Sequence, residues 1–264
     1  MLDHLLAATR PDACTTGLLY SHPMVEVVLG GALHPGGPEL TLELAQRARL
    51  GPDDHVLDVG CGKGGSAILL AKETGCRVTG WDVSPDAVAA AKAAAAAAGL
   101  AERVTFEVLP DGALPPGAGA FDAVLSECTL CLLGDQATTL SALHDHLRPG
   151  GRLLLSDVTV EDGAPGEAFR NAAGFVACLG GAGPDALLQD AVAAAGFDLT
   201  WHDNRPALLA ALRDRIRSRV NVEAILDALG APAAPLRGLV ATSERALDEG
   251  QLGYACLVAT RREA

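Results

Sequence analysis

Aromatic residues are scarce in this chain of 264 residues, since Phe, Tyr and Trp together make up only 3%. Hydrophobic residues still reach 49%, much of it alanine, so we expect a core of Leu, Val and Ala. No apolar run approaches the ~20 residues that span a bilayer, and no basic segment leads an apolar stretch at the N-terminus. We therefore expect a soluble cytoplasmic protein without a membrane partner.

Positive charge is also in short supply. Lys and Arg number 20 against 33 Asp and Glu, which gives a formal net charge of −13. Because phosphate backbones are bound by basic surfaces, we expect no nucleic-acid partner. The length suits one large or two small domains. Seven cysteines in an intracellular chain do not suggest a disulfide framework, so each is considered separately.

A glycine-rich turn dominates what is present. The apolar run Val56–Val59, interrupted by Asp58, leads into Gly60, Gly62 and Gly64, and a stretch of helix-forming composition follows. Strand, glycine turn and helix open a nucleotide-binding βαβ unit. Glycines allow a tight turn and let a ligand approach backbone N–H groups without a Cβ in the way.

An acidic residue, Asp82, follows Gly62 by 20 positions. At the carboxyl end of a second strand its carboxylate can accept hydrogen bonds from ribose hydroxyls. The glycine spacing is G-x-G-x-G, which differs from the G-x-G-x-x-G of dinucleotide sites. Asp58, just before the turn, would repel a phosphate and attract a cationic amino-acid group. The pattern indicates a nucleoside without phosphates.

The motifs between residues 50 and 160 resemble those of class I methyltransferases that use S-adenosylmethionine (SAM). The matching segments are Val56–Gly64, Trp81–Ser84, Phe121–Val124 and Leu147–Arg152. The resemblance implies that Asp58 and the three glycines line the methionine and sulfonium side and that Asp82 holds the ribose. The cofactor-binding residues implied in full are Asp58, Gly60, Cys61, Gly62, Gly64, Asp82, Val83, Asp111 and Ser126.

The expected fold is α/β, with a Rossmann-like, doubly wound sheet of seven mostly parallel strands. We divide the chain into an N-terminal helical cap (1–50), a SAM-binding core (51–204), and a helical insertion with the last strand of the core (205–264). Ser84 is a good N-cap for a helix that runs to about residue 98. Arginines at 213, 215, 217 and 219 predict a solvated helix face, or alternatively a lid or an oligomer surface. The oligomeric state stays open.

Two cysteines occupy informative positions. Cys128 follows the fourth predicted strand, where the ligand crevice of a doubly wound sheet lies, and Cys178 precedes a Gly-Gly-Ala segment that leads to a helix. Both positions resemble those of the arsenite methyltransferases, a branch of the same family. The resemblance implies that these thiolates bind trivalent arsenic, that a third cysteine (Cys14, or the extra thiol of Cys131) joins them, and that a thiol reductant takes part. Thiolates are soft ligands that select thiophilic ions.

Other interpretations remain open. In a second hypothesis, the methyl acceptor is a small organic molecule rather than a metalloid. His22, His34 or Glu127 would then be the acid–base groups, and the cysteines would only pack. Zinc at Cys128-x-x-Cys131 lacks a second ligand pair. A third hypothesis is a protein that binds SAM or a metalloid with little turnover.

The remaining cysteines and histidines receive structural predictions. We expect Cys76 and Cys256 to be small hydrophobic residues on buried strands. His144 and His146 precede the Leu-Arg-Pro-Gly-Gly turn on a helix and are predicted to lie on the surface.

Overall fold

A single seven-stranded sheet forms the centre of the molecule in the computed structural model, which describes residues 34–109, 112–161, 164, 169, 178–230 and 234–263. The strand order is β3-β2-β1-β4-β5-β7-β6, and β7 runs antiparallel to both of its neighbours. The strands are β1 (His55–Val59), β2 (Arg77–Asp82), β3 (Val104–Val108), β4 (Phe121–Glu127), β5 (Leu147–Val160), β6 (Phe197–Asn204) and β7 (Leu252–Arg261). The predicted fold class is confirmed.

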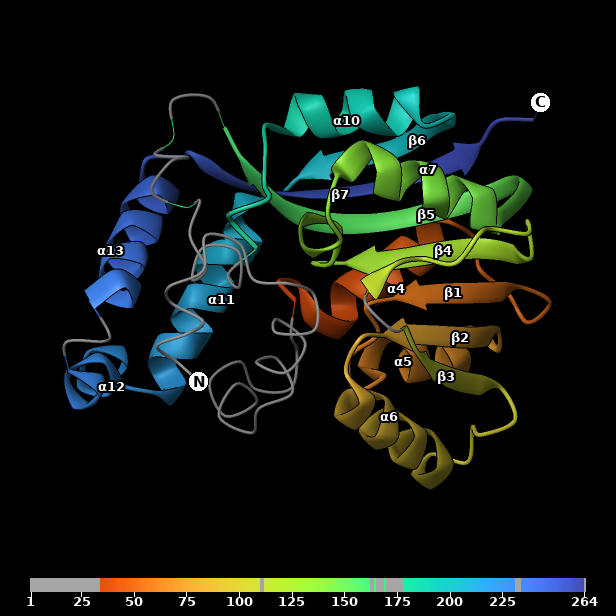
Figure 1. Ribbon diagram of the computed structural model, residues 1–264, viewed down its shortest axis with the longest axis horizontal. Helices are drawn as coiled ribbons and strands as arrows, with labels where there is room; N and C mark the ends of the chain where they lie inside the picture. Colours follow the sequence, from red (N-terminus) through yellow and green to blue (C-terminus); the bar gives the residue numbers. More distant parts are fainter. Residues whose placement is uncertain are drawn as a thin grey trace.

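Helices cover both faces of this sheet (Figure 1). The described helices are α4 (Gly37–Arg47), α5 (Gly65–Thr74), α6 (Pro85–Ala97), the short 3₁₀ helix η2 (Leu130–Leu132), α7 (Gln136–His146), α10 (Asp185–Ala194), α11 (Pro206–Arg219), α12 (Val222–Leu229) and α13 (Ala234–Asp248). The Ser84 side chain accepts a hydrogen bond from the Ala87 N–H, as expected for the N-cap of α6.

Side chains that alternate along each strand build two hydrophobic cores. On β1, Val56 packs into the core under α4, α5 and α6, whereas Leu57 and Val59 pack into the core under α7 and α10. Leu153 and Leu154 on β5 divide in the same way. Burial on both faces explains why these strands read as continuous apolar runs.

The direction of strand order reverses between β1 and β4, which pair in parallel. Ligands of doubly wound sheets bind in the crevice at the carboxyl ends of such a pair. The segments after β1, β2 and β4 therefore meet at one edge, and that edge carries the predicted site residues.

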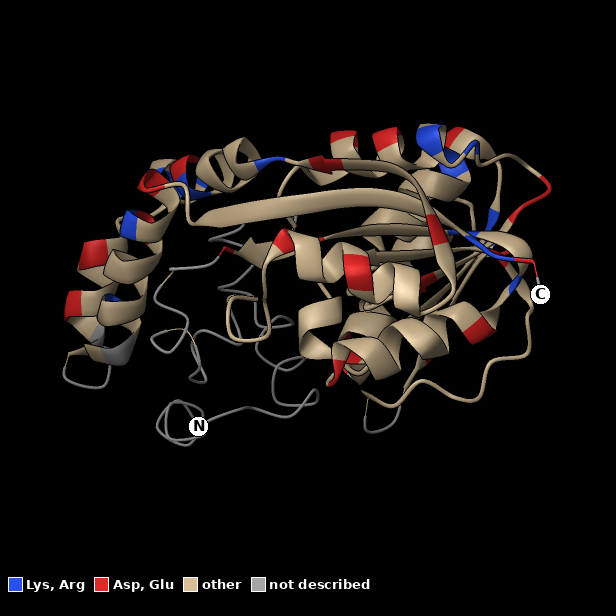
Figure 2. Cartoon of the chain, turned by 90° about the horizontal axis from the view of Figure 1, so that it is seen from above, with Lys and Arg blue, Asp and Glu red and all other residues tan. Residues whose placement is uncertain are grey.

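The insertion between β6 and β7 consists of α11, α12 and α13 and extends beyond the sheet (Figure 1). No residue of α11 is buried, and Arg213 and Arg217 form ion pairs with Asp248 and Glu244 of α13. These exposed ion pairs agree with the predicted solvated face. Acidic residues are spread over the outer helices, with basic residues interspersed (Figure 2).

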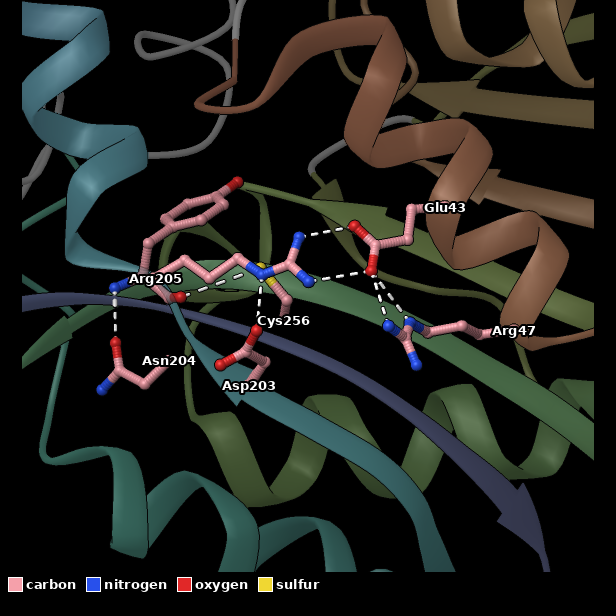
Figure 3. A network of polar contacts seen from close by, with 7 residues as sticks. Glu43, Arg47, Asp203, Asn204, Arg205 and Cys256 are labelled. Carbon is pink, nitrogen blue, oxygen red and sulfur yellow. Dashed lines mark hydrogen bonds and ion pairs between the residues drawn. The ribbon is translucent and has the colours of Figure 1, made fainter.

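An ion-pair network joins α4 to the segment between β6 and α11 (Figure 3). Glu43 accepts hydrogen bonds from Arg205 at 2.5 and 2.8 Å and from Arg47 at 2.8 and 2.9 Å. The Arg47 guanidinium lies 3.8 Å from the ring centroid of Trp201. Hydrogen bonds from Arg205 are the main reason why the pKa of Glu43 falls to about 2.

The surface position predicted for His146 is wrong. Its side chain is buried, and its ring lies edge-on to Trp81 at 5.0 Å and to Phe121 at 6.3 Å. The imidazole thus takes part in an aromatic cluster, in a chain that has few Phe, Tyr and Trp residues. Cys76 and Cys256 are buried as predicted, although Cys76 lies just before β2. Within the described residues, no helix has both the length and the apolar character of a membrane span.

Candidate active site

The glycine turn after β1 has a backbone that other residues would not adopt easily. Gly60, Gly62 and Gly64 have φ angles of 75°, 51° and 80°, in the left-handed region. A Cβ on Gly60 would lie 2.4 Å from the Thr129 side chain, and one on Gly64 would lie 2.5 Å from the ring of Phe106. The turn therefore needs glycine for its conformation and for space.

Asp82, at the end of β2, is anchored to this turn. One carboxylate oxygen accepts the Gly62 N–H at 2.8 Å and the other accepts the Ser84 N–H at 2.9 Å. Burial raises the pKa of Asp82, while these N–H groups act in the opposite direction. The carboxylate has further lone pairs that can accept the two hydroxyls of a ribose.

Asp58 and Ser126 carry buried polar atoms that lack a partner. Among the described residues, Asp58 Oδ2 and Ser126 Oγ have no hydrogen-bond partner, and both residues are less than 4% exposed. Burial is the main cause that raises the pKa of Asp58, and the charges of Glu127 and Asp82 raise it further. An ammonium group would supply the missing positive charge. The amino-acid end of SAM therefore fits here, beside a turn that suits a phosphate-free nucleoside.

The other predicted cofactor residues differ in position. Cys61 is buried in the core beside Gly80, and its thiol lies 3.8 Å from the Gly62 carbonyl oxygen. The backbone of Cys61 therefore forms part of the glycine turn, while its thiol packs in the core. Val83 is half-buried after Asp82, whereas Asp111 lies outside the described residues.

Glu127, the last residue of β4, contacts polar side chains from three segments. Its carboxylate accepts the hydroxyl of Thr41 at 3.0 Å and that of Ser66 at 2.6 Å, and it lies 3.5 Å from Nε2 of His34. The other ring nitrogen of His34 lies 3.2 Å from the Pro35 carbonyl oxygen. The structure thus brings together two of the residues predicted for acid–base chemistry, while His22 lies outside the described residues.

The predicted thiols also come together. The thiol of Cys178 lies 3.4 Å from the carbonyl oxygen of Cys128, and its sulfur interacts with those of both Cys128 and Cys131. Cys14 lies outside the described residues. Cys128 and Cys178 have φ angles of 52° and 60°, a conformation rare for residues with a side chain.

Asp157 completes this cluster, and sequence reasoning missed it. Its carboxylate oxygen and the sulfurs of Cys128 and Cys178 all lie within 4.8 Å of one another. Burial, followed by the Cys178 charge, raises the pKa of Asp157 to about 7. Tyr254 also contacts the group, since its hydroxyl lies 3.6 Å from the Cys128 sulfur. The available signal was an acidic residue inside the apolar run of β5.

Known proteins resemble the chain over this same region. The family model for a methyltransferase domain matches residues 50–203. An O-methyltransferase from Pyrenophora dematioidea is 28% identical over 173 residues, which cover 59% of this chain and 65% of the relative. The chain thus spans less than two thirds of that curated relative.

Solved structures share the fold over most of the chain. The [4+2]-cyclase SpnF has a TM-score of 0.78 at 24% identity, covering 97% of this chain and 98% of its own. Phosphoethanolamine N-methyltransferase 2 from Haemonchus contortus, solved in complex with SAM, has a TM-score of 0.71 at 22% identity, covering 90% of this chain and 56% of that one. At such identities the likeness concerns the fold alone.

These findings confirm the predicted class of SAM-dependent methyltransferase at the level of the family, whereas the arsenite branch stays a prediction. The matched family region contains the glycine turn, Asp82 and the end of β4, so the cofactor geometry and the sequence match agree. Because the match covers more than half of the chain, the protein belongs to the family of methyltransferase domains.

Proposed function

We propose that the protein transfers a methyl group from SAM to a small organic acceptor that loses a proton from oxygen or nitrogen. The single observation that carries this proposal is the His34–Glu127 pair beside the glycine turn, with 3.5 Å between Nε2 and the carboxylate. The O- and N-methyltransferases to which the chain is similar support an acceptor of this class.

The cofactor supplies an electrophilic methyl group on its sulfonium. The chain's own residues hold and orient it: Asp58 for the ammonium, the backbone of the glycine turn, and Asp82 for the ribose. Holding donor and acceptor in reacting geometry converts a bimolecular reaction into an effectively unimolecular one.

His34 then acts as the proton acceptor. A neutral imidazole has one nitrogen free to take the acceptor's proton, and the imidazolium that forms has two N–H groups. In this structure Nε2 faces the Glu127 carboxylate and Nδ1 faces the Pro35 carbonyl oxygen. The carboxylate and the carbonyl oxygen are both hydrogen-bond acceptors. One ring nitrogen must therefore turn from its present partner toward the methyl acceptor to take the proton, while the other keeps the ring oriented.

The test is formation of S-adenosylhomocysteine from SAM, measured with a panel of phenols, hydroxy acids and amines. We expect at least one acceptor to support turnover and His34→Gln and Glu127→Gln to reduce it. His55→Gln is the matched control, because His55 lies at the amino end of β1, at the opposite edge of the sheet. Turnover in no panel member, or parental rates in both variants, would contradict the proposal.

A second candidate acceptor is trivalent arsenic, and the convergence of the Cys128, Cys131 and Cys178 thiols favours it. A thiolate-bound arsenic keeps a lone pair that can attack the methyl group, so no general base is needed. Arsenite with a thiol reductant would then support turnover that Cys128→Ser and Cys178→Ser abolish and His34→Gln leaves unchanged. Arsenite-independent turnover of an organic acceptor in the serine variants would exclude this candidate.

A further inference from the structure

The cluster around Cys178 contains four groups that ligate metals. Cys128 follows β4, Cys131 lies in η2, Asp157 belongs to β5, and Cys178 precedes α10. Four stretches of chain thus deliver three thiols and one carboxylate to one place. Cys131, Asp157 and Cys178 are each less than 5% exposed, and Cys128 is half-buried.

The spacing of these groups suits a tetrahedral cation. In a zinc site with Zn–S near 2.3 Å and Zn–O near 2.1 Å, neighbouring ligand atoms lie about 3.6–3.8 Å apart. The sulfurs of Cys128 and Cys178 and a carboxylate oxygen of Asp157 already lie within 4.8 Å of one another. Contraction by about 1 Å or less would bring these three atoms to ligand distance.

Cys131 offers a further thiol beside this group. Its side chain interacts with the Cys178 thiol and the Asp157 carboxylate, but its sulfur is not among the ligand atoms that lie within 4.8 Å of one another, so it must move toward them to become the fourth ligand. Asp157 also accepts the backbone N–H groups of Cys131 at 3.1 Å and Val158 at 2.8 Å. Such bonds orient ligating carboxylates in metal sites.

The backbone supports a built site rather than a chance contact. The described part of the chain has three non-glycine residues in the left-handed region, and two of them are the ligands Cys128 and Cys178. Such a conformation is strained and persists where the surroundings require it. Gly181 adds a close approach, because a Cβ there would lie 2.4 Å from the Cys131 carbonyl oxygen.

We propose that Cys128, Cys131, Cys178 and Asp157 bind one zinc ion in a closed structural site. The carboxylate favours zinc over arsenic, because zinc accepts mixed sulfur and oxygen ligands, whereas soft thiolates are the ligands that select thiophilic ions. Binding releases the thiol protons to solvent, since the thiolate is the ligand species. The ion ties the segment before α10 to the ends of β4 and β5. This inference does not depend on the proposed organic acceptor, and it excludes arsenic as the occupant of the same thiols.

The experiment uses the full-length protein, purified without added metal and analysed by mass spectrometry for zinc. We expect about one zinc per chain. After chelation, cobalt(II) titrated into the parent protein should give a thiolate-to-cobalt charge-transfer band that saturates at about one equivalent. This second measurement needs no variant, so it remains informative if a variant fails to fold.

The variants Cys178→Ser and Asp157→Asn should weaken cobalt binding by about tenfold or more. Cys76→Ala is the control, because it removes a buried thiol outside the cluster and should retain parental zinc. Zinc below about 0.1 per chain without a cobalt band would overturn the inference. So would parental zinc in Cys178→Ser, or a parent protein that takes up arsenite but neither metal. SAM binding, measured in parallel, reports separately on the proposed function.

Discussion

The two sides of the crevice are built in different ways. On the cofactor side, backbone atoms and missing side chains define the shape: three left-handed glycines, two N–H groups that fix Asp82, and one oxygen of Asp58 that has no partner among the described residues. On the acceptor side, side chains from distant segments define it: His34 on Glu127, and the thiols on Asp157. Substitutions that add atoms should therefore harm the cofactor side most, and substitutions that remove functional groups should harm the acceptor side most.

The largest effect is expected on the acceptor side, at His34. His34→Gln should lower kcat by about 10²–10⁴-fold, the usual contribution of a general base, with little change in the Kd for SAM. Steady-state kinetics together with SAM titration separates the two quantities. Equal losses of kcat and SAM affinity would show that His34 belongs to the cofactor side.

On the cofactor side, an added methyl group at Gly60 should be costly. Gly60→Ala combines a left-handed φ with a clash at 2.4 Å, so we expect a loss of about 2–4 kcal/mol in unfolding free energy. Gly99→Ala is the control, because Gly99 has φ +71 but no atom within 4 Å of an added Cβ. Urea denaturation of both should show a much smaller loss for Gly99→Ala, and equal losses would mean that space at the turn is unimportant.

Asp58 should affect folding and binding in opposite directions. Its pKa is raised in the folded protein, so the stability linked to its protonated form is complete below the unfolded-state pKa and falls as pH rises. Asp58→Asn should therefore stabilise the SAM-free protein at pH 8, by about 1–3 kcal/mol, while weakening SAM binding. Asp53→Asn, at an exposed position, is the control. A variant that is less stable than the parent at pH 8 would contradict a cost from the Asp58 Oδ2 atom, which has no partner among the described residues.

The smallest effect concerns the link from α4 to Arg205. The pKa of Glu43 is lowered to about 2, so its contribution is present above the unfolded-state value near 4.5 and is lost as pH falls toward 2. Because the pair is partly exposed, Glu43→Gln should cost only about 0.5–1 kcal/mol at pH 7. Thermal melts from pH 7 to pH 2.5 should show the difference shrinking. If the difference in stability between parent and variant does not change with pH, the loss comes from packing. Glu223→Gln, which removes a more exposed ion-pair partner, is the control.

The cofactor side could be predicted from sequence because its signals are local. The interval between Gly62 and Asp82, the apolar run before the turn and the Ser84 cap are all short-range patterns. The hydrogen bond between the Gly62 N–H and Asp82 shows why that interval matters, since it closes the βαβ unit.

The acceptor side could be predicted only in part. The positions of Cys128 and Cys178 indicated a shared site, whereas Asp157 stood out only as a lone acidic residue in an apolar strand, which does not show what it faces. His34 lies 93 residues before Glu127, and only the packing of α4 against the sheet brings them together. His146 was misplaced because helical spacing does not show that an imidazole fills an aromatic position.

We propose that the crevice beyond β1 and β2 binds SAM through the glycine turn and Asp82. Isothermal titration of SAM into the parent protein and into Asp82→Ala measures this binding. We expect one site per chain in the parent and a loss of affinity of at least about tenfold in the variant, whose ribose acceptor is gone. Ser84→Ala, which loses the hydroxyl that caps α6 but keeps the backbone N–H that Asp82 accepts, should bind as the parent does. The absence of binding to the parent, or equal affinity in Asp82→Ala, would contradict the account.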